Sequence, residues 1–167
     1  MTRASLRGAL ILVLPEPRLE ELRARFDAKA VAAGIPLHIT LLFPFGLGEP
    51  GLAELFAPWS PLRFSLTRVE VFPEAAAWLA PEPVDELRRR ILELYARYPQ
   101  YPPYGGEFPD PVPHATVGQP AEVFEAVRAE AEPLLPIEFE VRAATLMEEV
   151  APERWRAGPS FPFEGAA

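Results

Sequence analysis

Hydrophobic positions along this chain fall into two kinds of run that alternate from the N-terminus onward. Apolar stretches closed by proline or glycine are typical of strands, whereas apolar residues three and four positions apart are typical of helices. Residues 6–14 are nearly all apolar and end at Pro15, which predicts a strand. Residues 18–33 have helical spacing and end at Gly34, and residues 35–45 form a second apolar run. The first part of the chain therefore predicts a strand, a helix and a second strand.

The remainder of the chain continues this alternation. The expected elements are a short helical piece at 52–56, a strand with one bulge at 63–72, its hairpin partner at 75–80, a helix at 84–98, an irregular loop at 99–113, a strand at 114–118, a helix at 122–135, a long strand at 137–150 and a returning strand at 155–163. The order of strand, helix and strand thus occurs twice, which indicates a structural duplication. On the 84–98 helix, Arg88, Arg89 and Arg90 flank the apolar stripe and are expected to form a solvated face.

Length and composition predict a single globular domain over residues 1–167. A chain of this length with 49% hydrophobic residues can bury a core. Its apolar runs are much shorter than the roughly 20 residues that a membrane-spanning helix needs, so residues 6–14 are expected to be a buried strand and not a signal segment. The chain has no cysteine, which excludes disulfides, thiolate nucleophiles, zinc fingers and iron–sulfur clusters. We therefore expect a cytoplasmic monomer.

The charged residues limit the class of partner. A net charge of −8 argues against a non-specific grip on a long nucleic acid, because that grip comes mainly from Lys and Arg. A small nucleotide or the end of an RNA remains compatible with this charge. The chain has 22 prolines, two glutamines, no asparagine and one lysine, Lys29. This composition fits a heat-adapted protein, although a GC-rich genome would produce much the same bias.

Histidine occurs at two positions only, and each begins a similar tetrad. Residues 38–41 have the sequence His-Ile-Thr-Leu, and residues 114–117 have the sequence His-Ala-Thr-Val, 114 − 38 = 76 positions later. Because only five of the 167 residues are threonine, composition alone would place Thr two positions after both histidines with odds of about one in a thousand. Imidazole titrates near neutral pH, so the matched pair predicts a general acid and a general base.

The spacing within each tetrad suits phosphoryl chemistry. Side chains alternate between the faces of a strand, so His38 should share a face with Thr40, and His114 with Thr116. The opposite face of the first strand would then hold Leu37, Ile39, Leu41 and Phe43. Two such strands facing each other would surround a phosphodiester with two imidazoles that move protons and two hydroxyls that donate to non-bridging oxygens. This arrangement requires no metal and no cofactor.

Two other interpretations of the histidines remain open. A lone His-x-Thr is more often a hydrogen-bonded strand end than a catalytic group. A metal site is the second alternative, in which Glu107 or Asp110 would join the imidazoles, although the spacing is not a metal-ligand motif. The repetition of the tetrad favours an enzyme over both alternatives.

Several segments resemble the two-histidine (2H) phosphoesterase superfamily and, within it, the 2′-5′ RNA ligase-like and cyclic phosphodiesterase family. The segments are residues 36–45 (PLHITLLFPF), 78–83 (WLAPEP), 101–106 (YPPYGG), 113–117 (PHATV) and 155–163. The resemblance implies a bilobal α+β fold of two pseudo-symmetric lobes, with antiparallel sheets around a central cleft. It also implies metal-independent hydrolysis of 2′,3′-cyclic phosphates or related phosphodiesters of nucleotides or RNA ends.

The resemblance assigns roles to individual residues. It implies that His38 and His114 are catalytic and that Thr40 and Thr116 bind the phosphate. No basic residue follows either tetrad, which favours hydrolysis over the 2′-5′ RNA ligation that some relatives perform. A non-catalytic module that binds a nucleotide or an RNA end is a further alternative. Aromatic residues of the 99–113 loop could stack a base or simply pack beneath the loop; they are Tyr101, Tyr104 and Phe108.

Overall fold

The structure of the protein, a computed structural model, describes residues 6–106 and 110–166. Its strands are β1 (Gly8–Val13), β2 (His38–Phe45), β3 (Leu62–Phe72), β4 (Ala76–Glu82), β5 (Ala115–Gly118), β6 (Ile137–Val141), β7 (Ala143–Ala151) and β8 (Arg154–Pro162). Its α-helices are α1 (Pro17–Phe26), α2 (Ala28–Ala32), α3 (Leu52–Phe56), α4 (Asp85–Arg97) and α5 (Phe124–Ala131). Three short 3₁₀ helices are η1 (Pro103–Gly106), η2 (Ala121–Val123) and η3 (Glu132–Leu134).

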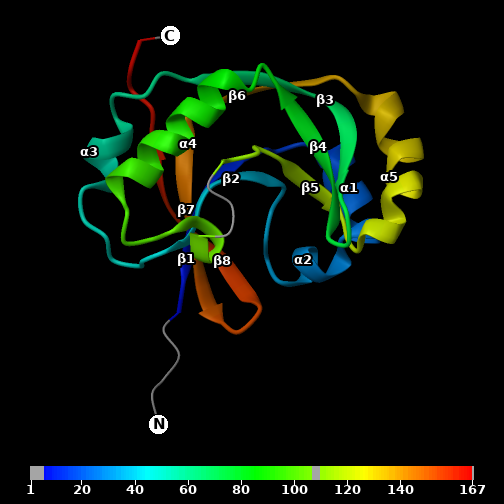
Figure 1. The fold of residues 1–167 in the computed structure, drawn as a ribbon, viewed down its shortest axis with the longest axis horizontal. Coiled ribbons are helices and arrows are strands. Elements are labelled where there is room, and N and C mark those ends of the chain that lie inside the picture. Colours follow the sequence, from blue (N-terminus) through cyan, green and yellow to red (C-terminus); the bar gives the residue numbers. More distant parts are fainter. Residues whose placement is uncertain (1–5, 107–109, 167) are drawn as a thin grey trace.

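The strands form two antiparallel sheets of four strands each (Figure 1). The first sheet has the order β2-β1-β7-β8 and the second has the order β5-β4-β3-β6. The predicted α+β fold with two antiparallel lobes is therefore confirmed. In both sheets the strand that carries a His-x-Thr tetrad lies at the edge. It pairs with the strand of the same sheet that precedes it along the chain, so β2 pairs with β1 and β5 pairs with β4.

Each sheet is covered by a helix that follows a strand of the other sheet. Helix α1 follows β1 but packs against β5 and α5, whereas α4 follows β4 but packs against β2 (Figure 1). Both helices bury an apolar stripe, as their helical spacing predicts; the buried leucines and isoleucine are Leu19, Leu22, Leu87, Ile91 and Leu94. One hydrophobic cluster includes residues from both sheets and from these helices.

The predicted long strand at 137–150 is wrong in one respect, because the chain changes sheets within it. Residues up to Val141 form β6 beside β3 in the second sheet, and residues from Ala143 form β7 beside β1 in the first sheet. Only the exposed Arg142 separates the two strands. The predicted return is confirmed, since β8 pairs with β7. The predicted bulge in the 63–72 strand is also present, as a register shift between Leu66 and Arg68.

Two predicted helices are shorter than expected. The 18–33 helix is interrupted at Asp27, whose φ of −140° and ψ of 42° are not helical, so α1 ends there and α2 begins. The 122–135 helix is α-helical only from Phe124 to Ala131. It ends as the 3₁₀ turn η3, which contains Pro133, because proline has no N–H to donate within an α-helix.

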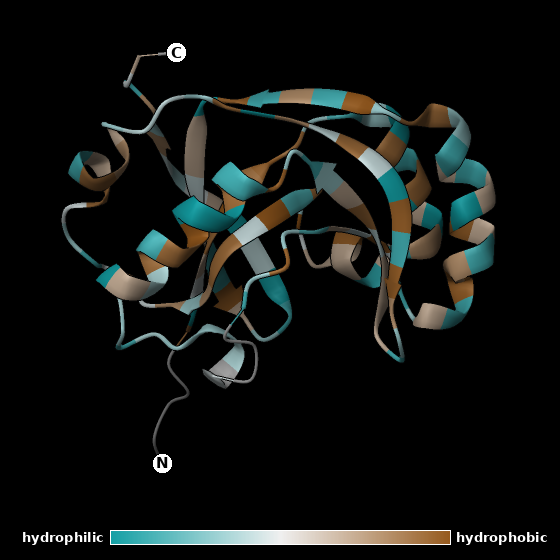
Figure 2. Ribbon diagram, turned by 45° about the horizontal axis from the view of Figure 1, so that its top comes forward, coloured by the Kyte–Doolittle hydropathy of each residue, from teal (hydrophilic) through white to brown (hydrophobic). Residues whose placement is uncertain are grey.

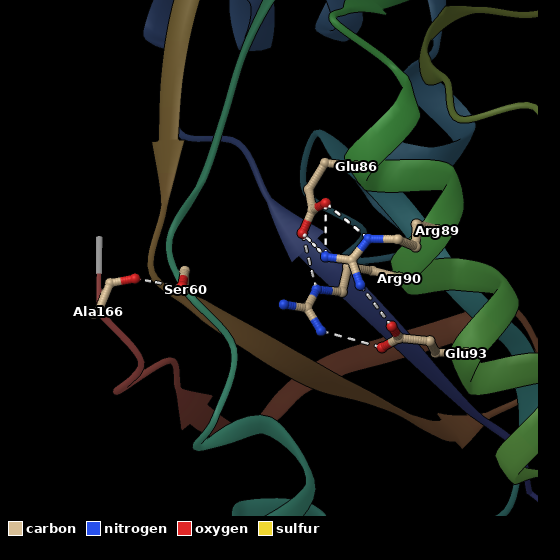
Figure 3. A network of polar contacts seen from close by, with 6 residues as sticks. All are labelled: Ser60, Glu86, Arg89, Arg90, Glu93 and Ala166. Carbon is tan, nitrogen blue, oxygen red and sulfur yellow. Dashed lines mark hydrogen bonds and ion pairs between the residues drawn. The ribbon is translucent and has the colours of Figure 1, made fainter.

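The arginines of α4 have three different environments. Arg89 is exposed and pairs with Glu86 and Glu93, as expected of a solvated face (Figure 3). Arg90 joins the same network, but its guanidinium lies 4.9 Å from the ring centroid of Trp59 and its side chain is only 16% exposed. Arg88 is not part of this network and instead donates to the carbonyl oxygen of Pro111. The solvated-face prediction therefore holds for Arg89 alone.

Burial follows the hydropathy of the strands. Hydrophobic and hydrophilic residues alternate along β3 (Figure 2), and its buried positions alternate in the same way. The C-terminal segment closes against the region before β3, where the Ser60 hydroxyl donates to the Ala166 carbonyl (Figure 3). Within the described residues, no helix is long and apolar enough to cross a membrane.

Candidate active site

The two histidines come together from equivalent places in the two sheets. His38 is the first residue of β2, and His114 directly precedes β5. These edge strands pack against each other. The rings are close enough for the charge of His114 to affect the pKa of His38. β2 and β5 are edge strands of different sheets, and their contact brings the two tetrads together.

The two imidazoles are held in the same way. The Nδ1 of His38 is 2.7 Å from the carbonyl oxygen of Pro36, and the Nδ1 of His114 is 2.7 Å from the carbonyl oxygen of Val112. A carbonyl oxygen can only accept, so each neutral ring must carry its proton on Nδ1 and donate it. Each Nε2 therefore keeps a lone pair that is available for proton transfer.

An arginine holds each of the two segments that lead into a histidine. Arg23 of α1 donates through Nη2 to the carbonyl oxygen of Ile35 at 2.8 Å, and Arg88 of α4 donates to the carbonyl oxygen of Pro111. Both carbonyls belong to the residue three positions before a histidine, next to the carbonyl that accepts from the ring. Arg23 is 1% exposed. The two lobes thus repeat a backbone contact that no feature of the tetrads predicted.

A carboxylate adds to this support on the His38 side. Glu20 accepts from the backbone N–H of Leu37 at 2.8 Å and from Arg23 Nη1 at 2.8 Å. Charge-assisted hydrogen bonds of this kind are roughly twice as strong as neutral ones. The residues on both sides of Pro36, whose carbonyl orients the His38 ring, are therefore fixed to α1.

Burial keeps both rings neutral in the absence of an anion. The pKa of His38 is lowered to about 4, mainly by burial and also by the positive charge of Arg23, while the hydrogen bond to Pro36 opposes this change. Burial also lowers the pKa of His114, against the hydrogen bond to Val112. The aromatic rings of Phe72 and Trp78 surround His114, with centroids 5.0 and 5.8 Å from its ring.

Two cavities meet beside the histidines. The larger has a volume of about 480 Å³ and includes His114 and Thr40 in its wall, and the smaller has a volume of about 290 Å³ and includes His38 and Thr40. Thr40, Phe43 and Tyr104 line both cavities. Thr40 therefore joins the cavity wall that contains His38 to the cavity wall that contains His114.

The predicted position of Phe43 on the core face of β2 is wrong. Strict alternation placed its side chain in the core with Leu41, but it lines both cavities. The register with β1 explains the difference, because Ile11 pairs with Thr40 while the preceding Leu10 pairs with Leu42. The extra residue, Leu41, forms a bulge that returns Phe43 to the side of Thr40. The unbroken apolar run after Thr40 hides this change of face in the sequence.

The other predicted site residues have different positions. Thr116 is partly buried, as are His114 before it and Thr40 in the other tetrad, but it is not among the described residues that line the two cavities. The ring of Tyr101 packs against Phe45 with centroids 5.0 Å apart, and its hydroxyl donates to Glu49 at 2.7 Å. Tyr104, in contrast, lines both cavities, and its hydroxyl is hydrogen-bonded to the Thr40 side chain.

The residues proposed for a metal site are only partly described. Asp110 lines the larger cavity with His114, whereas Glu107 lies outside the described residues, as does Phe108. Across residues 6–106 and 110–166, no three His, Asp or Glu side chains form a group that could hold a metal ion.

Arg7 is a site residue that the tetrads did not indicate. It lies directly before β1 and lines the smaller cavity with His38. Its guanidinium carbon is 5.1 Å from the ring centroid of Phe43. The sequence offered no signal for it, because its proximity to the site depends on the pairing of β1 with β2.

Comparison with known proteins shows similarity to one family and to several solved structures. The family model described as 2′-5′ RNA ligase superfamily matches residues 13–153. The fold is similar to that of TT0787 from Thermus thermophilus, with 21% sequence identity and a TM-score of 0.61 over 96% of this chain and 100% of that chain. It is also similar to E. coli LigT complexed with 3′-AMP, with 20% identity and a TM-score of 0.59 over 95% and 98% of the two chains. No curated protein sequence matches the chain.

Proposed function

Since the chain belongs to the 2′-5′ RNA ligase superfamily, whose members are phosphoesterase- or ligase-type enzymes, we propose that it hydrolyses 2′,3′-cyclic phosphates of nucleotides or RNA ends. The observation that carries this proposal is the matched pair of imidazoles. In both rings Nδ1 donates to a backbone carbonyl, and each ring lines a cavity whose wall also includes Thr40. Two proton-transfer groups and a hydroxyl donor are the groups that this hydrolysis requires.

The reaction uses one imidazole as a base and the other as an acid. A water molecule attacks the phosphorus while the Nε2 of one ring accepts its proton. The bond from phosphorus to one ribose oxygen breaks, and the protonated Nε2 of the other ring donates its proton to that oxygen. The product is a nucleoside 2′- or 3′-monophosphate with one free ribose hydroxyl. The proton has then moved to the opposite ring, and exchange with solvent restores the starting state.

Binding of the substrate causes one imidazole to become protonated. Both rings are neutral in the free site because burial lowers their pKa. A phosphate anion between them favours the charged form of a ring and raises its pKa, so one ring takes up a proton when substrate binds. The Thr40 hydroxyl, and that of Thr116, would donate to the non-bridging oxygens on which negative charge accumulates.

The larger cavity suits the nucleoside. Its volume of about 480 Å³ and its largely apolar wall, which includes Phe72, Tyr95 and Tyr104, provide ring faces that accept any base. E. coli LigT, whose fold is similar, was solved with 3′-AMP, which is the same class of compound as the proposed product. We assign the base platform to Tyr104 and leave Tyr101 a packing role.

The test is turnover of nucleoside 2′,3′-cyclic phosphates in the presence of EDTA. We expect His38→Ala and His114→Ala each to lower kcat by about 10² to 10⁴-fold. Thr40→Val should lower it less, and Thr67→Val, a strand threonine that donates to Ala80 at 3.4 Å, is the matched control. Full activity in either histidine variant would overturn the proposal, and loss of activity in EDTA would replace it with a metal-dependent hydrolase.

Two other outcomes identify the alternatives. Tight binding of a nucleotide without turnover would indicate a binding module. Formation of a 2′-5′ bond from RNA ends that carry a cyclic phosphate and a 5′-hydroxyl would indicate a ligase. Both assays use the same two histidine variants as controls, so each result refers to the same site.

A further inference from the structure

Arg7 is a cation on the wall of the candidate site. Among the described residues that line the two cavities, it is the only one with a positively charged side chain. The smaller cavity, of about 290 Å³, places it on the same wall surface as His38 and Thr40. A substrate with several phosphates would therefore meet one fixed cation in addition to the two imidazoles.

The guanidinium of Arg7 is oriented before any ligand binds. Its Nη2 donates to Glu149 Oε2 at 3.1 Å, and its Nε donates to Glu149 Oε1 at 3.3 Å. The Phe43 ring supports the guanidinium from another side, at 5.1 Å from the guanidinium carbon. Glu149 is 8% exposed, and its hydrogen bonds to Arg7 hold its pKa below the usual range, so it stays ionised. This pairing fixes one edge of the guanidinium.

The remaining edge of the guanidinium is available. Nη1 makes no hydrogen bond to any described residue. The Arg7 side chain is 50% exposed, whereas its partner carboxylate is 9% exposed. A guanidinium donates in a planar fork, and its free N–H groups can meet a phosphate oxygen while the other edge stays on a carboxylate.

The position along β1 separates Arg7 from the reacting phosphate. Thr40 pairs with Ile11, and the four residues from Ile11 back to Arg7 span about 13 Å along the strand. The long Arg7 side chain shortens this separation, because its guanidinium carbon lies 5.1 Å from the ring centroid of Phe43, which is three residues after Thr40 on β2. The guanidinium is thus offset along the cavity, toward the next phosphate of a nucleotide whose reacting group lies at Thr40.

We infer that Arg7 binds a second phosphate of the substrate, one nucleotide unit away from the phosphate that reacts. This inference rests on the proposed function, which puts the reacting phosphate between the imidazoles. The second phosphate has two chemical sources: the phosphodiester that joins the last two nucleotides of an RNA end, or the 5′-phosphate of a mononucleotide. In either case Arg7 makes the site selective for substrates with two phosphates.

The experiment is a calorimetric titration of the wild-type protein and variants with three probes. The probes are adenosine 3′-monophosphate, adenosine 3′,5′-bisphosphate and the dinucleotide ApAp, which has one internucleotide and one terminal phosphate. We expect the wild-type protein to bind at least one two-phosphate probe more tightly than the monophosphate. Arg7→Gln should weaken that probe about tenfold relative to the monophosphate. Preference for ApAp identifies an RNA end, and preference for the bisphosphate identifies a 5′-phosphate.

Two further variants keep the result interpretable. Arg63→Gln is the matched control, because Arg63 is 54% exposed and pairs with Glu140 at 3.1 Å, like Arg7, but lies on β3 outside both cavities. It should leave all three affinities unchanged. The double variant Arg7→Gln with Glu149→Gln replaces the ion pair by two amides, and it serves if Arg7→Gln alone unfolds because Glu149 is left buried and unpaired.

The possible results separate this inference from the proposed function. Equal weakening of all three probes by Arg7→Gln, or wild-type binding that does not distinguish one phosphate from two, overturns the role of Arg7. The absence of binding by all three probes overturns it as well. Failure of the wild-type protein to hydrolyse cyclic phosphates, combined with Arg7-dependent binding, overturns the proposed function and leaves the second phosphate site standing.

Discussion

Asp27→Asn tests how a buried carboxyl and the partly buried imidazole of His38 together set the pH dependence of stability. Asp27 lies in the break between α1 and α2 and is 4% exposed. Its only charged neighbour among the ion pairs of the described residues is Arg23, with Nε and Oδ2 4.0 Å apart. Burial raises the pKa of Asp27 from 3.8 to about 6, and the positive charge of Arg23 opposes this rise.

The magnitude follows from the two pKa values. A difference between 3.8 and about 6 corresponds to about 3 kcal/mol, because one pKa unit is worth about 1.4 kcal/mol. Below about pH 4, both the folded and the unfolded state protonate Asp27, and the group has no effect. As the pH rises from about 4 to 6, the unfolded state ionises Asp27 while the folded state keeps its proton, so stability is lost over this range and levels off above it. At pH 8, Asp27→Asn should therefore be more stable than the wild type by up to about 3 kcal/mol.

His38 acts in the opposite direction over the same range. Its pKa of about 4 in the folded state lies below the ordinary value of 6.5, so the unfolded state binds the additional proton between these values. Stability from this group is thus lost as the pH falls from 6.5 to 4, and it nearly cancels the contribution of Asp27. Between about pH 4.5 and 6, the free energy of unfolding of Asp27→Asn should rise with pH more steeply than that of the wild type, by about 1.4 kcal/mol per pH unit.

The measurement is urea unfolding followed by tryptophan fluorescence at intervals from pH 4.5 to 8. Asp110→Asn is the control, because Asp110 is exposed on a loop and its replacement should change stability by less than about 0.5 kcal/mol. Parallel curves for the wild type and Asp27→Asn would refute the reasoning, since the two states would then bind the Asp27 proton equally.

Three further predictions concern single positions. Arg88→Leu frees the carbonyl of Pro111, so kcat for cyclic phosphates should fall about tenfold with little change in KM, and Arg88→Lys should restore part of it; an effect on KM alone would argue against a positioning role. Gly34→Ala puts a Cβ 2.3 Å from the Trp155 carbonyl oxygen at a φ of +88°, and should lower the free energy of unfolding in urea by about 2 kcal/mol. Arg89→Ala removes exposed ion pairs and should change the same quantity by less than about 1 kcal/mol.

The sequence predicted the elements better than their partners. Apolar runs closed by proline and glycine identified β1, β2 and β5, and helical spacing identified α4. The change of sheet at Arg142 could not be predicted, because no glycine or proline separates β6 from β7. Which sheet a strand joins depends on distant partners, here β3 and β1, and not on its own residues.

The candidate site was predictable only where a residue type carries its own chemistry. The repeated His-x-Thr singled out four residues, of which His38, Thr40 and His114 line the two cavities and Thr116 does not. Arg7 and Arg23 could not be found in this way, because arginine is frequent in this chain and their roles depend on which carbonyl or cavity they reach. Their positions follow from strand pairing and from the burial of α1.

The exchange of helices between the sheets has a consequence for how the molecule can be divided. A fragment that ends after β2 would contain α1 without the β5 edge that it covers, and its own sheet would lack α4 as a lid. This fragment and the remainder of the chain would therefore each expose apolar surface when expressed separately, although the two pieces mixed together could reconstitute each other.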